Sequence, residues 1–162
     1  MSTVYLGLGS NIQPLQNLRL AVSELRANFT GVTLSNVFRS KALGFDGEDF
    51  LNLVVRLETH LSPGEVFTLL EEIHEQSGRD RGSEKFLSRR LDIDLLLYDD
   101  QVIDEPPVRL PRSDVLEYSF VLLPLAEIAG DYVHPVSGRT LADHLGEFDL
   151  DCHPLTRQDV IL

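Results

Sequence analysis

The sequence predicts an α+β fold: a ferredoxin-like β-α-β-β-α-β sandwich with additional elements at the C-terminal end. Runs of apolar residues with strand character alternate with stretches of helical periodicity in this order. The connections between them are short, and no internal repeat, low-complexity tract or linker interrupts the 162 residues. Elements in this order favour a mostly antiparallel sheet that helices cover on one face.

The first half of the predicted order begins with an apolar strand over residues 4–8. The strand ends in Gly9-Ser10-Asn11, a turn signal, and the helix that follows has Pro14 in its first turn. A single β-rich stretch comes after this helix, and residues 50–57 predict a further strand. Between these two strands, residues 41–49 form an acidic loop that contains glycine.

The second half of the order begins with a capping box, in which Ser62 is the N-cap and Glu65 stands three residues later. The helix that it starts is expected to end near Gly78. Residues 91–98 then predict a fourth strand, and Asp99-Asp100 predicts a turn after it.

Beyond that strand, Pro106, Pro107 and Pro111 predict an irregular stretch. Residues 120–128 look helical apart from Pro124, and residues 140–145 predict a last short helix. We therefore expect a single domain over residues 1–146 and a C-terminal tail over residues 147–162.

Composition narrows the class of protein. Cys152 is the only cysteine, so neither a disulfide framework nor a cysteine-based zinc site is available, and the five histidines show no metal-ligand spacing. Each histidine is predicted to lie at the surface or in a cap. No apolar run approaches the roughly 18 residues of a membrane span, and the N-terminus does not resemble a signal peptide. We expect a cytoplasmic protein that does not associate with membranes.

The charge distribution is uneven along the chain. The net charge is −12, which argues against polymeric nucleic acid as a partner because phosphates would be repelled. Residues 79–90, however, contain five basic and two acidic residues, a net charge of +3, so the rest of the chain carries −15. Forked guanidinium donors in such a segment suit the oxygens of a small polyphosphate, although a solvated loop explains the same composition equally well.

Two aspartates follow this basic segment directly. In residues 91–98 the side chains alternate, with Asp92 and Asp94 on one face of the strand and Leu91, Ile93, Leu95 and Leu97 on the other. Two carboxylates on one face, with Cα atoms about 6–7 Å apart, can converge on Mg²⁺, which prefers one or two carboxylates completed by water and phosphate oxygens. Arginines beside such a pair are typical of nucleotide-dependent phosphoryl transfer.

The standard nucleotide motifs are absent from the sequence. Gly7-Leu8-Gly9 has Ile12 where a dinucleotide fingerprint requires its third glycine, and neither a Walker lysine motif nor a kinase catalytic loop is found.

Four segments of the chain form a specific set: residues 5–11 (YLGLGSN), 50–52 (FLN), 78–81 (GRDR) and 89–98 (RRLDIDLLLY). Together they resemble the 6-hydroxymethyl-7,8-dihydropterin pyrophosphokinase family of folate biosynthesis, in one colinear register from about Val4 to His134. The resemblance implies the ferredoxin-like fold and the transfer of pyrophosphate from MgATP to the hydroxymethyl group of the pterin, which releases AMP. It further implies ATP as co-substrate and two Mg²⁺ ions. We expect a monomer whose partners are small molecules.

The resemblance also implies which residues contact the pterin. Phe50 and Phe120 fall where the family holds the pterin ring between two aromatic side chains, and Asn52 falls where an amide hydrogen-bonds the pterin edge. Four residues are expected to contribute backbone to the same pocket: Gly9, Ser40, Ala42 and Leu43.

Catalysis and nucleotide binding are assigned by the resemblance to a second set of residues. Asp92 and Asp94 fall on the two Mg²⁺ ligands of the family, and Arg112 falls where the family has a phosphate-binding histidine. The expected catalytic residues are Arg79, Arg89, Asp92 and Asp94, and the expected nucleotide-binding residues are Arg79, Arg81, Arg89 and Arg112.

Departures from the family pattern lie mainly on the nucleotide side. Phe86-Leu87-Ser88 stands where the family usually has Trp-Gly-Pro, Tyr118 replaces an arginine, and His74 replaces an acidic residue. These substitutions leave open an alternative, a diverged paralogue that binds pterins but has lost or redirected the kinase step. A non-enzymatic RNA-recognition module has the same element order, but the net charge and the absence of an aromatic-basic stretch on a central strand argue against it.

Overall fold

The computed structural model describes residues 1–44, 46–77 and 91–162. The first half of the chain forms β1 (Ser2–Ser10), α1 (Pro14–Asn28), β2 (Thr30–Leu34), β3 (Val37–Ser40), β4 (Phe50–Thr59), α2 (Pro63–Gln76) and β5 (Asp92–Tyr98). The second half forms β6 (Ile103–Glu105), β7 (Val108–Leu110), α3 (Asp114–Glu117), α4 (Ser119–Ala129), α5 (Leu141–Glu147) and β8 (Thr156–Gln158).

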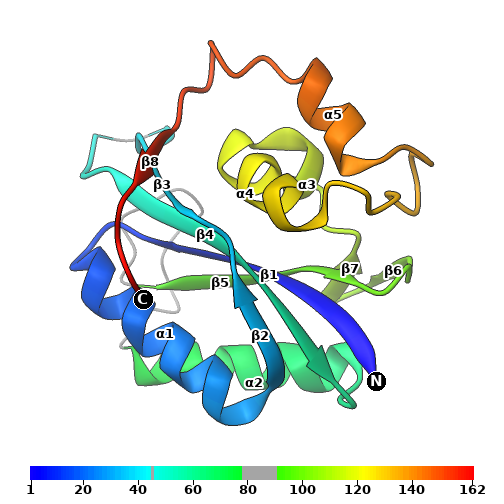
Figure 1. Cartoon of the computed structure of the whole chain (residues 1–162). Coiled ribbons are helices and arrows are strands. Elements are labelled where there is room, and N and C mark those ends of the chain that lie inside the picture. The colour runs from blue at the N-terminus through cyan, green and yellow to red at the C-terminus, as the bar shows by residue number, and fades with distance from the viewer. Residues whose placement is uncertain (45, 78–90) are drawn as a thin grey trace.

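The main sheet has the strand order β5-β1-β4-β3-β8, and β2 also pairs with β4 (Figure 1). The pairs in it are antiparallel, with β1 and β4 at the centre. The predicted ferredoxin-like arrangement is therefore confirmed, and β6, β7, the last three helices and β8 are additions to it.

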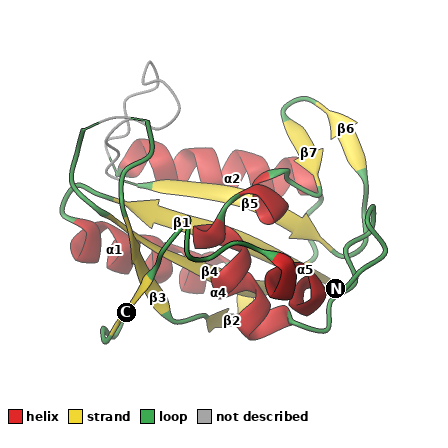
Figure 2. Ribbon diagram, turned by 90° about the horizontal axis from the view of Figure 1, so that it is seen from above, coloured by secondary structure: helices red, strands yellow, loops and turns green. Residues whose placement is uncertain are grey.

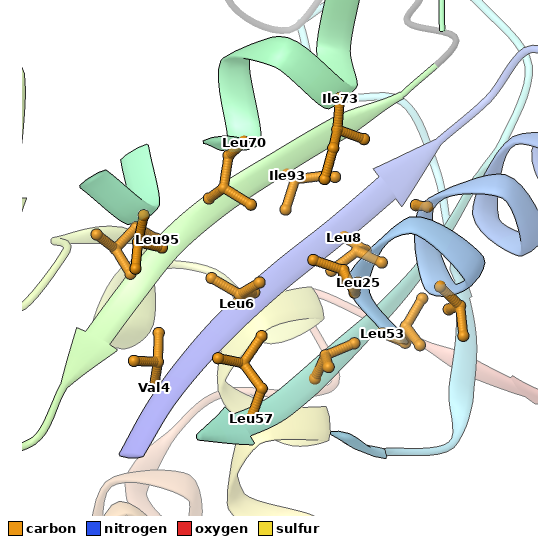
Figure 3. Packing of buried hydrophobic residues seen from close by; sticks show 14 of the residues in the cluster. Val4, Leu6, Leu8, Leu25, Leu53, Leu57, Leu70, Ile73, Ile93 and Leu95 are labelled. Carbon is orange, nitrogen blue, oxygen red and sulfur yellow. The ribbon is translucent and has the colours of Figure 1, made fainter. Parts of the chain in front are cut away.

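Helices cover both faces of the sheet, whereas the sequence predicted one covered face. One hydrophobic cluster joins the sheet to α1 and α2, and it includes Leu6, Leu25 and Leu70 (Figure 3). A second cluster on the opposite face joins Val54 to the last three helices through residues such as Leu122 (Figure 1). The central strands carry apolar side chains on both faces, so the second face is stable only when α4 and its neighbours bury it.

The single strand predicted after α1 is divided into β2 and β3. Ser35 lies between them, is buried, and accepts a hydrogen bond from the Val54 N–H to its Oγ at 2.8 Å. Its own N–H donates to the Val54 carbonyl at 2.9 Å. A serine side chain thus replaces a backbone acceptor in the ladder, which interrupts the strand while leaving the β4 N–H satisfied.

A bulge changes the predicted alternation along β5. Tyr5 pairs with Leu97 and Leu6 pairs with Leu95, so Leu96 is an extra residue on β5. The side chain of Leu97 consequently joins the second cluster together with Leu96, whereas Leu95 packs in the first cluster. The prediction that Leu97 shares a face with Leu95 was wrong because one inserted residue reverses the phase of a period-two pattern.

Two further segments differ from the sequence prediction. The stretch that contains Pro106, Pro107 and Pro111 was predicted to be irregular, but residues 103–110 form the β6–β7 hairpin, with a cis Pro106–Pro107 bond at its turn. This hairpin projects beside α2 (Figure 2). Helix α4 continues through Pro124, which is itself buried in it. Burial of the apolar side chains around this proline offsets the roughly 3 kcal/mol that a proline costs inside a helix.

The C-terminal residues return to the sheet. β8 pairs with β3, with Phe38 opposite Arg157, and the side chains of Val160 and Leu162 pack against the first cluster. Among the described residues, no helix is both long and apolar enough to cross a membrane.

Candidate functional site

A polar row crosses three strands at one end of the sheet. Gly9 of β1 pairs with Asn52 of β4 on one side and with Asp92 of β5 on the other. Paired residues point to the same face, so Asn52 and Asp92 share the face on which α4 lies. Their Cα atoms are separated by two inter-strand spacings, about 10 Å. The row therefore brings a predicted pterin ligand and a predicted metal ligand to one surface.

Asn52 is held rigidly by β3. The side chain is 5% exposed, and its Nδ2 atom donates to Ser40 Oγ at 2.8 Å and to the Phe38 carbonyl at 3.4 Å. Both amide hydrogens are thus directed at β3, and the amide oxygen lies on the side of Gly9. This arrangement leaves Oδ1 as the acceptor that Asn52 presents to a ligand.

Gly9 provides the room for that oxygen. A Cβ atom at position 9 would lie 3.2 Å from Asn52 Oδ1 and 3.8 Å from a ring carbon of Phe50. Any larger residue would therefore press on both side chains. Gly9, Ser40, Phe50 and Asn52 are neighbours in the sheet, and that they form one pterin pocket stays a prediction.

Phe120 lies in the first turn of α4, the helix that packs on this face. Its ring stacks on Tyr118, with ring centroids 5.1 Å apart and an angle of 13° between the planes. Phe50 and Phe120 are both half-buried. Both rings are thus more exposed than an ordinary core phenylalanine, and flat faces of this kind suit a planar heterocycle.

The remaining predicted pterin contacts lie in the loop after β3. Ala42 is half-buried and Leu43 is 36% exposed. The far end of this loop is tied to the turn before α1, since Asn11 Nδ2 donates to the Glu48 carbonyl at 3.2 Å.

The two predicted metal ligands lie side by side on β5. Asp92 and Asp94 are half-buried and face the same side, opposite Gly9 and Gly7 of β1 respectively. Gly7 and Gly9 add no side chains of their own beside the carboxylates, and the Leu96 side chain packs against Gly7. Two carboxylates with room for water and phosphate oxygens fit Mg²⁺, which rarely uses an all-protein cage. In residues 1–44, 46–77 and 91–162, no cluster of three or more His, Cys, Asp or Glu side chains could hold a metal.

Arg112 lies beside one of these carboxylates, that of Asp94. Its backbone N–H donates to the Leu96 carbonyl at 2.9 Å, which anchors it beside β5. The guanidinium lies 3.6 Å from Asp94 Oδ1 and 3.2 Å from Asp114 Oδ2. Burial by itself lowers the pKa of Arg112, but the carboxylates of Asp94, Asp114 and Asp92 outweigh burial and raise it. Arg112 is therefore a fixed positive charge next to the predicted metal site.

Asp114 is a member of this charge cluster that the sequence reasoning missed. It is buried and contacts Arg112 from the start of α3. The sequence did contain a signal for this contact: Asp114 stands two residues after Arg112 at the start of a helix, where an acidic residue is favoured.

A cleft of about 220 Å³ opens beside Asp94, between α2, β5 and β7. Its polar lining comes from Asp94 and Arg112 at the site and from Glu71, His74 and Arg109 further along. The apolar lining includes side chains of all three elements: Phe67, Leu70, Ile93, Leu95, Pro107 and Val108.

His74 corrects a sequence prediction. It was expected at the surface or in a cap, yet it is only 3% exposed and its Nε2 atom accepts the Ile93 N–H at 2.8 Å. An edge strand has backbone groups without a strand partner, and here a histidine from the adjoining helix satisfies one of them.

The three other predicted arginines, Arg79, Arg81 and Arg89, lie outside the described residues, as does Phe86-Leu87-Ser88. The structure thus brings together the predicted pterin side, the carboxylate pair and Arg112, and the arginine segment stays a prediction.

The chain is similar to known proteins over most of its length. The family model described as 7,8-dihydro-6-hydroxymethylpterin-pyrophosphokinase (HPPK) matches residues 5–130. A 2-amino-4-hydroxy-6-hydroxymethyldihydropteridine pyrophosphokinase from Synechocystis sp. is 40% identical over 147 residues, which cover 88% of this chain and 74% of that protein. A protein of the same name from Haemophilus influenzae is 38% identical over 141 residues, covering 85% of this chain and 88% of the relative.

Solved structures agree in fold. An HPPK-DHPS chain from Plasmodium falciparum superposes with a TM-score of 0.73 at 13% identity, over 91% of this chain. The match spans only 43% of the Plasmodium chain, so this protein corresponds to less than half of that longer one.

Proposed function

Since the chain belongs to the 7,8-dihydro-6-hydroxymethylpterin-pyrophosphokinase family, we propose that the site around Gly9 carries out the reaction of that family. The enzyme is an ATP-dependent pyrophosphokinase of folate biosynthesis. The observation that supports the site assignment is the row of Asn52, Gly9 and Asp92 across three strands: the residues proposed as pterin acceptor and metal ligand lie on one face of the sheet.

In the proposed reaction, the hydroxymethyl oxygen of the pterin attacks the β-phosphorus of ATP. The bond between the β-phosphorus and the oxygen that bridges it to the α-phosphate breaks, AMP leaves with that oxygen, and the hydroxyl proton is released. Little covalent work falls to the protein, so catalysis consists of positioning and of stabilising negative charge.

The pterin side orients one substrate. Phe50 and Phe120 would hold the two faces of the ring, and Asn52 Oδ1 would accept a hydrogen bond from an N–H group at its edge. Ala42 and Leu43 would close the pocket from the loop, and Ser40 fixes the Asn52 amide through its hydroxyl. The fixed amide selects a ring with donors at that edge.

The nucleotide side orients the second substrate. Asp92 and Asp94 would hold Mg²⁺, which neutralises phosphate charge and polarises the attacked phosphorus when bound. Arg112 would contact the triphosphate, and the cleft that leads away from Asp94 along α2 would take the rest of the nucleotide. Arg79, Arg81 and Arg89 complete this proposal as phosphate contacts. The binding of two ions, the monomeric state and the cytoplasmic location are part of the same proposal.

The test is an HPLC assay for AMP from ATP, with and without 6-hydroxymethyl-7,8-dihydropterin and Mg²⁺. We expect AMP only when both additions are present. Pterin binding by isothermal titration without pterin-dependent AMP would instead favour the diverged paralogue.

A further inference from the structure

His74 is joined to the strand of the two carboxylates by one hydrogen bond. Its Nε2 atom accepts the Ile93 N–H at 2.8 Å, and its Nδ1 atom lies 3.0 Å from Glu71 Oε1. A ring nitrogen that accepts cannot carry a proton, so the proton of the neutral ring is on Nδ1 and is donated to Glu71. Glu71 therefore fixes both the tautomer and the orientation of the ring.

Ile93 is the residue between Asp92 and Asp94. Its side chain packs in the first hydrophobic cluster with Ile73 of α2, the neighbour of His74 in the chain (Figure 3). Asp92 and Asp94 point to the other face. The imidazole thus holds the backbone of Ile93 in place. A rotation of the backbone at Ile93 would change the direction of both neighbouring carboxylates.

We propose that His74 is a positioning residue for pyrophosphoryl transfer, which sets the direction of Asp92 and Asp94 through the Ile93 amide. The inference rests on the proposed function, because it takes the two carboxylates as metal ligands. Such ligands must be held within about 0.5 Å of the productive geometry, and hydrogen bonds behind them provide this precision. In the described sheet, β5 is an edge strand that pairs with β1. On its other side, the hydrogen bond from the Ile93 N–H to His74 of α2 takes the place of a bond to a second strand.

Two variants separate positioning from mere stability. His74→Leu removes the acceptor, whereas His74→Gln retains an amide oxygen that can reach the Ile93 N–H. Tyr98→Phe is the matched control: the Tyr98 hydroxyl donates to the Leu61 carbonyl at 2.6 Å and ties the other end of β5 to the start of α2.

Metal binding is measured by Mn²⁺ electron paramagnetic resonance in the presence of α,β-methylene-ATP, and turnover by the AMP assay. We expect His74→Leu to weaken Mn²⁺ binding and to lower kcat by about 10- to 100-fold, as for other residues that orient metal ligands. We expect His74→Gln to recover Mn²⁺ binding and kcat to near the wild-type values, and Tyr98→Phe to change neither. An unaltered Mn²⁺ affinity in His74→Leu, or an equal loss in Tyr98→Phe, would overturn the proposal.

The hydrogen bond itself has a direct signature in the wild-type protein. ¹⁵N NMR should show an unprotonated His74 Nε2 and a scalar coupling between this nitrogen and the Ile93 amide nitrogen. A protonated Nε2 would refute the geometry whether or not the variants fold. A direct contact between His74 and the nucleotide would instead raise the KM for ATP in His74→Gln with kcat unchanged, and this too would count against positioning. If the wild type forms no AMP, the proposed function fails, while the Mn²⁺ and NMR measurements still decide the role of His74.

Discussion

At the scale of single residues, the predicted site depends on side chains that contacts within the protein hold in place. The amide nitrogen of Asn52 donates both of its hydrogens to β3, and the amide oxygen lies on the side of Gly9, where we propose that it accepts from the pterin. Arg112 is held between Asp94 and Asp114, which keeps its charge next to the predicted metal site. In each case, contacts within the protein orient the group before a substrate arrives, so less of the binding energy is lost in ordering it.

Asp94→Asn tests the metal site. The variant keeps the shape of the side chain but loses the charge, and we expect kcat to fall at least about a hundredfold. Bound metal contributes several kcal/mol to the transition state, and each tenfold in rate corresponds to about 1.4 kcal/mol. The AMP assay measures the loss. Asp131→Asn, at an exposed aspartate outside the site, should retain full activity, and an active Asp94→Asn enzyme would remove the metal assignment.

Asn52→Ala tests the pterin side. The variant loses the proposed acceptor and leaves Ser40 without its buried partner. The dissociation constant for the pterin should therefore rise roughly tenfold, because a hydrogen bond contributes about 1–1.5 kcal/mol. Isothermal titration checks this, and MgATP binding should not change. Ser35→Ala is the control, because Ser35 is also buried and also hydrogen-bonds to a strand. It should lower the Tm and leave pterin affinity intact; weaker pterin binding there would indicate a general loss of structure.

His134 predicts a pH dependence of stability. Burial, and then the charge of His144, lowers the pKa of His134, and its Nδ1 accepts from the N–H groups of Val136 and Ser137. The unfolded chain therefore binds a proton more readily than the folded one. The free energy of unfolding should fall as the pH drops below about 6.5, the ordinary pKa of histidine.

Urea denaturation between pH 7.5 and 5 measures this slope. In His134→Asn the amide oxygen can still accept the two backbone N–H groups without titrating, so its slope should be flatter. Equal slopes in both proteins would contradict the assignment to His134.

At the scale of the elements, the additions to the core fold support the strands that carry the site. β8 pairs with β3, and β3 supplies the acceptors that hold Asn52. Helix α4 covers the face of the polar row and brings Phe120 to it. The hairpin β6–β7 lines the cleft beside Asp94. β8, α4 and the β6–β7 hairpin thus each contact the site through a strand or form part of its wall.

Deletion of residues 156–162 tests the role of β8. The change removes the pairing with β3 and the packing of Val160 and Leu162 on the core. We expect the free energy of unfolding to fall by about 2–4 kcal/mol, since each buried aliphatic side chain contributes roughly 1.5–3 kcal/mol. Urea denaturation measures the change. Arg19→Ala removes only the exposed hydrogen bonds to the Ile161 carbonyl and should cost less than about 1 kcal/mol; an equal loss in both variants would show that β8 itself contributes little.

At the scale of the whole molecule, the two substrates should stabilise the fold. A ligand at one hundred times its Kd adds about 2.7 kcal/mol, which for a domain of this size raises the Tm by roughly 5–10 °C. We expect such a shift with Mg²⁺ and α,β-methylene-ATP, and its loss on adding EDTA. Thermal scanning measures it, and Asp94→Asn should show only a metal-independent shift. A Tm that EDTA leaves unchanged would argue against a metal at this site.

Local patterns in the sequence were enough to predict the core β-α-β-β-α-β order, the antiparallel ferredoxin-like sheet and the position of Asp92 and Asp94 on one face of a strand. These features depend on residues that are close in the chain: a capping box, a helical repeat and the alternation of a strand. The pterin contacts could be predicted only from the family resemblance, since single aromatic or amide residues carry no local signal.

Only the tertiary structure decided how the site is held. The second covered face, the reversed side chain of Leu97, the pairing of β8 with β3 and the bond from His74 to Ile93 each join segments far apart in the sequence. The free energy of these contacts comes from burial and hydrogen bonds between segments that meet only when the chain folds. No local sequence pattern therefore predicts them. The sequence by itself thus predicted which groups do the chemistry, and the folded packing determined where each of the described ones lies.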